Sequence, residues 1–444
     1  MDPAACTPFF SVRRGARRAP RVYCEDIALE CVAQSCGTPA YVYSGAAIAS
    51  SYRELHRALG RLPHTLCYAV KAGGNLAILR LLARLGSSFD IVSGGELDRL
   101  RRIGVHGGRI VFSGVGKTRE EIREALRYPG TRGRGAKHSG ILLFNVESEA
   151  ELEVLTGEAA RQVSAGGAPP AVSVRVNPDV RAGGHPHIST GYHHHKFGLD
   201  WPAAHRLYLA HRGSRWIRWR GISAHIGSQI TSLAPFRRAL ARLAQYSREL
   251  WREGIALRYL DFGGGLGIRY TGEDAPARAA YARALAAIVK PLGCHLLLEP
   301  GRTIIGPAGV LLTRVLYIKE NRGKTFVIVD AAMNDLIRPA LYGAIHPITK
   351  VSCEGALTRS KKKTVDVVGP VCETGDCLIH DWPLEDVQPG DLLAVWCAGA
   401  YGFVQSSNYN ARPRAVEVLV GGKRFRIIRR RESREDLVRG ESAR

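Results

Sequence analysis

The stretch that decides the fold runs from Thr65 to Gly114 and reads TLCYAVKAGGNLAILRLLARLGSSFDIVSGGELDRLRRIGVHGGRIVFSG. Three short apolar runs, TLCYAV, SSFDIVS and RIVFSG, are separated by longer stretches in which Leu, Ala and Arg recur with helical spacing. Short apolar runs of this kind are typical of buried strands, and the longer stretches are typical of amphipathic helices. The segment therefore predicts strands that alternate with helices.

The same alternation continues along the chain through the runs GILLFNV, AVSVRVN, GISAHIG, YLDFGGG and HLLLEPG. About eight strand–helix repeats predict a (β/α)8 TIM-like barrel over residues 45–309. After Gly309 the pattern changes to apolar runs with little helix between them, among them KTFVIVD, KTVDVVGP and AVEVLVGG. They predict a second, mostly antiparallel β domain over residues 310–444. Residues 21–44 are expected to join this domain, and the Arg, Ala and Pro-rich residues 1–20 to form a disordered basic tail.

Composition limits the class of protein. The net charge of +23 comes mainly from arginines. They are spread along helical stretches as solvated faces, without the aromatic interleaving of a nucleic-acid site, so no nucleic-acid partner is expected. No run of about 18 apolar residues suits a membrane span, which predicts a soluble, cytoplasmic protein. Ten cysteines without a CxxC pair are expected to be reduced thiols.

Polar residues follow several predicted barrel strands, where barrel enzymes place their active sites. Lys71 ends the run YAVK, and desolvation there would free its amine to form a Schiff base, although a lone strand-end lysine is more often a surface residue. The consecutive glycines Gly263 to Gly265 could cradle a phosphate with their N–H groups. Glu299 could hold a pyridinium nitrogen protonated, and Arg302 offers a planar fork to a carboxylate or phosphate. His225 could lie flat on an aromatic cofactor.

Taken together, these clusters resemble the fold-type III pyridoxal phosphate-dependent decarboxylases, the family of diaminopimelate, ornithine and arginine decarboxylases. The resemblance runs from about Gly37 to about Leu437 and includes YAVKA, FDIVSGGEL, HIGSQI, DFGGGLG, EPGR, MNDLIRPALYGA and CETGD in the family's order. It implies that pyridoxal 5'-phosphate is held by Lys71, stacked on by His225 and faced at its pyridine nitrogen by Glu299. The remaining cofactor-binding residues implied by the resemblance are Arg175, Ser228, Gly263, Gly264, Gly265, Gly301, Arg302 and Tyr401.

The segment MNDLIRPALY resembles that of diaminopimelate decarboxylases, which implies that meso-2,6-diaminopimelate is converted to L-lysine and carbon dioxide in the last step of lysine biosynthesis. This substrate carries a second amino acid head, so a selective pocket needs a cation for the distal carboxylate and an anion for the distal ammonium. Arg302 and Arg338 with Tyr342 could supply the first, and Glu373 the second, with Tyr401 near both substrate and phosphate. A decarboxylase for ornithine or lysine would have little use for the arginines.

The run CETGD resembles the family's loop from a partner subunit, in which the cysteine protonates the carbanion. Cys372 is therefore the expected proton donor, and a homodimer with shared active sites is implied. The chain departs from the family at Gly73, where an asparagine is usual, and activity is expected nevertheless. His185, His187 and His193 to His195 are expected to form a polar loop rather than a metal site, because no cysteine or carboxylate joins them at ligand spacing.

Three other functions remain open at the level of the sequence. The least favoured is a nucleic-acid binder, which the net charge alone suggests. Another is a broader decarboxylase of D-amino acids, or of lysine and ornithine, on the same scaffold. The third is a non-catalytic regulatory homologue, against which the retention of Lys71, Cys372 and Glu373 argues.

Overall fold

The computed structural model describes Thr7 and residues 9–15, 18–129, 140–181, 196–351 and 362–443. The chain divides into two compact units. The first comprises residues 1–51, 268–273 and 302–444, and the second comprises residues 52–267 and 274–301. The barrel expected over residues 45–309 includes residues 45–51, 268–273 and 302–309, which belong to the first unit.

The second unit is a barrel. Within the described residues, eight parallel strands close on themselves in the order β10-β11-β12-β5-β6-β7-β8-β9, so the predicted (β/α)8 fold is confirmed. The strands are β5 (His64–Ala69), β6 (Ser88–Ile91), β7 (Ile110–Phe112), β8 (Leu143–Val146), β9 (Ala171–Arg175), β10 (Arg218–Ser223), β11 (Tyr259–Asp261) and β12 (His295–Leu298).

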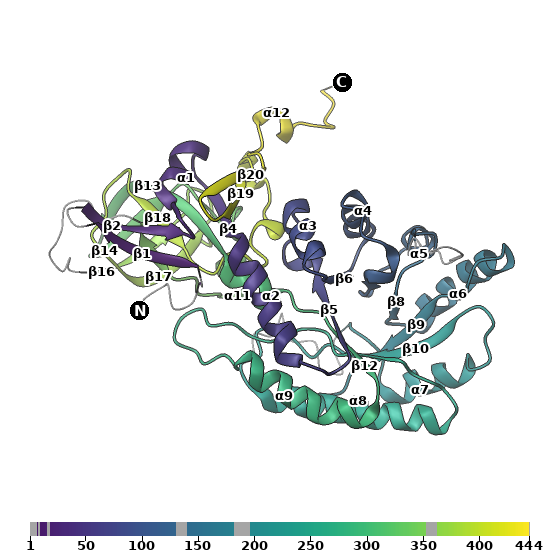
Figure 1. Ribbon diagram of the computed structural model, residues 1–444. Helices are drawn as coiled ribbons and strands as arrows, with labels where there is room; N and C mark the ends of the chain where they lie inside the picture. Colours follow the sequence, from purple (N-terminus) through teal and green to yellow (C-terminus); the bar gives the residue numbers. More distant parts are fainter. Residues whose placement is uncertain are drawn as a thin grey trace. The chain divides into compact units, whose positions relative to one another are not determined.

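Helices cover the outside of the barrel strands (Figure 1). Several begin where the sequence supplies an N-cap: the side chains of Ser93, Thr118 and Ser148 each accept a hydrogen bond from a backbone N–H of the first turn. The helices are α2 (Gly45–Leu59), α3 (Leu76–Arg84), α4 (Gly94–Arg102), α5 (Arg119–Leu126), α6 (Glu149–Ser164), α7 (Trp201–Ala210), α8 (Leu233–Arg252) and α9 (Arg278–Val289).

The first unit is built on a mostly antiparallel sheet in the order β17-β16-β14-β13-β4-β19-β20, with β18 pairing β13 and β15. Two pairs of neighbouring strands in it are parallel, β14–β16 and β4–β19, and the other described pairs are antiparallel. The predicted, mostly antiparallel β domain is therefore confirmed. Its larger elements are β4 (Ala40–Ser44), β13 (Gly309–Asn321), β14 (Lys324–Val329), β15 (Ile348–Lys350), β16 (Lys363–Val368), β17 (Cys377–Leu384), β18 (Leu392–Val395), β19 (Val416–Gly421) and β20 (Arg424–Arg429). Its helices are α1 (Leu29–Cys36), α10 (Arg302–Ile305), α11 (Arg338–Tyr342) and α12 (Arg434–Leu437).

The N-terminal segment corrects one expectation. Residues 1–20 were expected to form a disordered tail, but residues 10–15 form β1 (Phe10–Gly15) and residues 18–20 begin β2 (Arg18–Cys24), which pair antiparallel and continue to β3 (Ile27–Ala28). The cause is burial, since Phe10, Val22 and Cys24 pack into the core of the first unit. The arginines between them conceal this sparse apolar pattern in the sequence.

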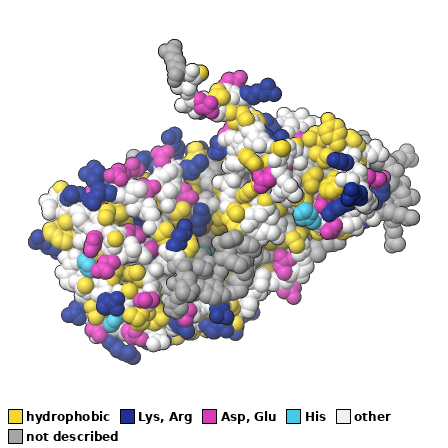
Figure 2. All heavy atoms as spheres, turned by 180° about the vertical axis from the view of Figure 1, so that it is seen from behind, with side chains coloured by type: hydrophobic (Ala, Val, Ile, Leu, Met, Phe, Trp, Pro, Cys, Tyr) yellow, Lys and Arg dark blue, Asp and Glu magenta, His cyan; other side chains and the backbone are white. Residues whose placement is uncertain are grey.

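The distribution of surface charge and the hydropathy of the helices indicate whether the molecule meets what nucleic-acid and membrane partners require. On the face shown in Figure 2, lysine and arginine side chains are interspersed with aspartate and glutamate. Within the described residues, no helix is both long and apolar enough to cross a membrane.

A buried ion pair fixes the loop after β7 to α6. The Lys117 ammonium is fully buried and donates to Glu151 Oε1 at 2.7 Å and to the carbonyl oxygens of Gly114 and Asn145. Breaking such a pair leaves an uncompensated buried charge. We expect Glu151→Ala to lower the free energy of unfolding by about 3 kcal/mol in urea denaturation. Glu153→Ala, on the exposed face of the same helix, should change it by less than about 0.5 kcal/mol. Equal losses would show that the pair is not the cause.

Candidate active site

A cavity of about 400 Å³ opens at the carboxyl ends of the barrel strands. Four of the residues predicted from the sequence lie in it together, although they come from distant parts of the chain: Lys71, Arg175, His225 and Glu299. The other lining residues are Val92, Ser113, Gly114, Val115, Gly116, Asn145, Phe197, Ser223, Ala224 and Asp261.

Lys71 lies in the short 3-10 helix η2 (Val70–Ala72) that follows β5. Its side chain is 34% exposed, and its Nζ donates to Asp90 Oδ2 at 2.6 Å. Asp90 is fully buried within β6, and its other oxygen has no hydrogen-bond partner among the described residues. Asp90 thus points the amine into the cavity. No role was predicted for Asp90 from the sequence, although the residue lies in the run FDIVSGGEL.

Two further buried carboxyl groups face the same cavity. Glu299 follows β12 and is 8% exposed, while Asp261 ends β11 and is 1% exposed. Burial raises the pKa of Glu299 well above its usual value, and the negative charges of Asp261 and Asp90 raise it further. Burial also raises the pKa of Asp261 to about 6. Acidic groups held in this way can retain a proton near neutral pH.

His225 is held by the glycine run. The N–H of Gly264 donates to His225 Nδ1 at 3.2 Å, so this nitrogen is unprotonated and Nε2 carries the hydrogen. Burial, followed by the positive charges of Arg175 and Lys71, lowers the pKa of His225 well below its usual value. The ring is therefore neutral at neutral pH.

The glycines after β11 permit a close approach of backbone segments. A Cβ atom on Gly264 would lie 2.4 Å from the carbonyl oxygen of Glu299, and one on Gly263 would lie 2.6 Å from His225 Nδ1. Only glycine fits at these two positions. The N–H groups of Gly263 and Gly264 already donate to Asp261 Oδ1 and His225 Nδ1, so a bound anion would compete with these side chains for them. The cavity that holds the Lys71 amine, the neutral His225 ring and the buried Glu299 suits an aldehyde cofactor such as pyridoxal phosphate. The other predicted phosphate residues, Ser228 and Gly301, lie in the loops after β10 and β12.

Arg175 ends β9 and forms an ion pair with Glu147, the two side chains being 2.9 Å apart. Its guanidinium also lies over the ring of Phe197, 4.9 Å from the centroid. Both contacts fix the guanidinium at the cavity wall.

A second cluster of predicted residues lies within the first unit. Arg302 and Arg338 are each 5% exposed and both donate to the Tyr270 hydroxyl, at 2.5 and 3.3 Å. The guanidinium of Arg302 lies over the ring of Tyr401, and that of Arg338 over the ring of Tyr342. Two buried guanidiniums side by side make a strong site for a carboxylate.

The orientation of the Arg338 side chain is fixed by a hydrogen bond to His346. The Nε2 of His346 accepts from Arg338 Nε at 3.1 Å, and its Nδ1 donates to the carbonyl of Trp396 at 2.9 Å. Burial and the charge of Arg338 lower the pKa of His346 to about 3. Tyr270 and His346 were missed in the sequence, because an aromatic residue and a histidine with no neighbouring motif give no signal.

Cys372 and Glu373 lie in the loop between β16 and β17 and are both exposed. The N–H of Cys372 donates to Asn410 Oδ1, and Glu373 accepts from the hydroxyl of Tyr409, which raises the pKa of that tyrosine. An exposed thiol is available to a ligand or to another chain.

The predicted histidine loop lies outside the described residues. Within them, one group has metal-ligand types, namely Asp366, Cys377 and His380. The carboxylate of Asp366 already accepts from Lys324 Nζ at 2.8 Å and from His380 Nδ1 at 2.9 Å. The ammonium thus competes for the oxygen that a cation would need.

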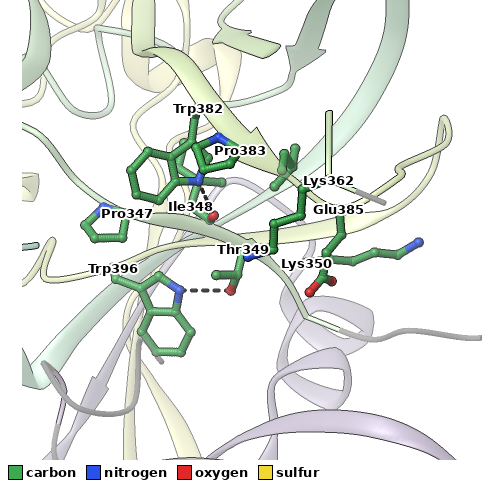
Figure 3. Close-up of a pocket in the computed structure, with 10 residues that line it drawn as sticks. Pro347, Ile348, Thr349, Lys350, Lys362, Trp382, Pro383, Glu385 and Trp396 are labelled. Atoms are coloured by element: carbon green, nitrogen blue, oxygen red, sulfur yellow. Dashed lines mark hydrogen bonds between the residues drawn. The ribbon is translucent and has the colours of Figure 1, made fainter. Parts of the chain in front are cut away.

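A further cavity of about 260 Å³ lies in the first unit and is drawn in Figure 3. The indole N–H of Trp382 donates to the Ile348 carbonyl, and that of Trp396 donates to Thr349 Oγ1. No site residue predicted from the sequence is among the described residues that line it.

Comparison with known proteins places the chain among decarboxylases. Residues 46–306 match the family model described as pyridoxal-dependent decarboxylase, pyridoxal binding domain. A diaminopimelate decarboxylase of Pseudomonas aeruginosa is 48% identical over 96% of this chain and 98% of its own length. One from Aquifex aeolicus is 42% identical over 97% of both chains.

Solved structures agree with these relatives. The diaminopimelate decarboxylase of Helicobacter pylori, complexed with L-lysine, superposes with a TM-score of 0.85 at 39% identity, covering 93% of this chain and 98% of the other. The diaminopimelate decarboxylase of M. jannaschi has a TM-score of 0.89 at 33% identity over 99% of both chains.

The neutral state of His346 has a consequence for pH. Its pKa in the folded protein is about 3, below the usual 6.5, so only the unfolded chain takes up a proton here as the pH falls below about 6.5. Stability from this group is present above that pH and lost below it. We expect the stability advantage of the parent over His346→Gln to shrink by about 2 kcal/mol between pH 7 and pH 5. Urea unfolding at both pH values measures this difference, and a gap independent of pH would contradict the assignment.

Proposed function

The chain belongs to the diaminopimelate decarboxylases of the pyridoxal-dependent decarboxylase family, and from this premise we propose how its residues convert meso-2,6-diaminopimelate to L-lysine and carbon dioxide. The observation that carries the proposal is the barrel cavity, in which a lysine amine, a neutral histidine and a buried glutamate meet. This reaction is the last step of lysine biosynthesis.

Each of the predicted residues in the cavity would contact a different part of the cofactor. Lys71 would hold pyridoxal 5'-phosphate through its amine, His225 would lie on its ring, and Glu299 would face its pyridine nitrogen. When bound, pyridoxal phosphate supplies an electron-withdrawing ring that accepts the electrons left by the departing carboxylate. The glycines after β11, with Ser228, Gly301, Arg302 and Tyr401, would surround the phosphate, and Arg175 would lie at the phenolic side.

The arginine cluster supports a substrate with a second carboxylate. Arg338 forms no ion pair with a carboxylate among the described residues, although it is almost fully buried beside Arg302. A buried cation without an anion is costly, and a carboxylate ligand would remove that cost. We therefore assign the distal carboxylate to Arg302, Arg338 and Tyr342, and the distal ammonium to Glu373.

Cys372 would deliver the proton after carbon dioxide leaves. The thiol is exposed on its loop, which supports a role at the active site of a second copy of the chain. The proposed active form is therefore a homodimer with shared sites.

The proposed role of the arginine cluster in substrate binding can be tested by measuring KM for meso-diaminopimelate in a variant of Arg338. Arg338→Met keeps the volume of the side chain and removes the hydrogen bonds of its charged head to the substrate. We expect KM for meso-diaminopimelate to rise about 10- to 100-fold, because a hydrogen bond to a charged group is lost. Arg424→Met, an exposed arginine on β20, should leave KM unchanged. Parent KM values in the Arg338 variant would contradict the substrate assignment.

Shared sites can be tested by complementation. Lys71→Ala and Cys372→Ala should each lower the decarboxylation rate about a thousandfold or more, because each removes a reacting group. When the two variants are mixed and allowed to exchange subunits, about one quarter of the parent activity should return, since about half of the dimers hold one intact site. Mixed variants that stay inactive, although mixed dimers form, would show that each site lies within one chain.

A further inference from the structure

Short polar side chains from neighbouring barrel strands form one continuous chain of hydrogen bonds that ends on Glu299. Ser223 and Ser173 lie 3.3 Å apart on β10 and β9, and Ser173 donates to Asn145 Oδ1 on β8. Asn145 Nδ2 donates to Ser113 Oγ at 3.1 Å, and Ser113 Oγ donates to Glu299 Oε1 at 3.2 Å. All these side chains are buried, although all but Ser173 also line the cavity.

Asn145 fixes the direction in which the Ser113 hydroxyl points. The amide oxygen of Asn145 accepts from Ser173, and its nitrogen donates to both Ser113 and Asp261, the latter at 2.8 Å. Each polar atom of the amide is thereby satisfied, and its orientation is set. Because a lone pair of Ser113 Oγ takes the amide N–H, the hydroxyl hydrogen is directed to Glu299.

The surroundings of Glu299 otherwise favour its neutral form. Burial raises its pKa, and the negative charges of Asp261 and Asp90 together with a side-chain hydrogen bond to Asp261 raise it further, while the ammonium of Lys71 acts in the opposite sense. A hydrogen bond donated to a carboxylate favours the charged form. In the part of the chain that the structure describes, Ser113 is the only hydroxyl that makes such a bond to Glu299.

We propose that Ser113 is a positioning residue, whose hydroxyl aims the Glu299 carboxyl group and favours its ionised form, so that Glu299 can hold the ring nitrogen of pyridoxal phosphate protonated. This inference rests on the proposed function. Asn145 acts one step further back, by fixing the Ser113 hydroxyl. No role was assigned to either residue from the sequence, because a serine and an asparagine at strand ends carry no motif.

The protonation of the ring nitrogen can be measured directly in the cofactor-loaded protein. With the cofactor labelled with nitrogen-15 at the ring, the parent should give the chemical shift of a protonated pyridine. Ser113→Ala should move the shift toward that of the unprotonated ring and lower kcat about tenfold or more, with KM within about twofold. Ser113→Thr keeps the hydroxyl and should restore both values.

Two further variants test the other members of the hydrogen-bonded chain. Asn145→Ala keeps the Ser113 hydroxyl but frees its direction, so it should give an effect between those of the parent and Ser113→Ala. Ser223→Ala, at the far end of the chain of bonds, should leave the nitrogen shift at the parent value.

The outcomes separate this inference from the function on which it rests. A parent-like nitrogen shift in Ser113→Ala would overturn the inference and leave the proposed function intact. Failure of Ser113→Thr to restore the shift would also overturn it, since the loss would then follow from packing. A parent protein that binds no pyridoxal phosphate would overturn the proposed function, and the inference with it.

Discussion

The structure depends on the placement of several acidic groups inside one barrel mouth. Asp90, Asp261 and Glu299 are all nearly or fully excluded from water, and among the described cationic side chains only the Lys71 ammonium forms an ion pair with one of them. Burial of like charges is unfavourable unless protons, hydrogen bonds or a cationic ligand compensate. Asn145, Ser113 and the N–H of Gly263 supply some of that compensation. The part of this electrostatic cost that is not compensated favours the binding of a positively charged ligand. A protonated pyridine ring would meet that requirement.

The first unit presents the opposite electrostatic situation. Arg302 and Arg338 both donate to the Tyr270 hydroxyl. Arg338 also donates to the neutral ring of His346. This cluster prefers an anion for the same reason that the barrel mouth prefers a cation. One chain thus offers complementary environments for a cationic ring and for an anionic substrate group.

Much of this could be predicted from the sequence, because strand periodicity and strand-end motifs are local signals. The barrel, the β domain and the convergence of Lys71, His225 and Glu299 follow from such signals. Asp90, Ser113, Asn145 and Tyr270 could not be found in this way, because each matters only through a neighbour distant in the chain. The strand at Phe10 was missed for another reason, since arginines between its apolar residues obscure the burial.

The position of β4 has a consequence for the order of assembly. This strand ends at Ser44, yet it lies in the interior of its sheet between β13, which begins at Gly309, and β19. During synthesis on the ribosome, β4 emerges long before either neighbour exists, so it cannot pair with β13 or β19 while the barrel segment is made. Such delayed, non-local pairing slows folding and exposes an apolar strand edge to other nascent chains. Production of this protein should therefore depend strongly on temperature and on chaperones that shield that edge.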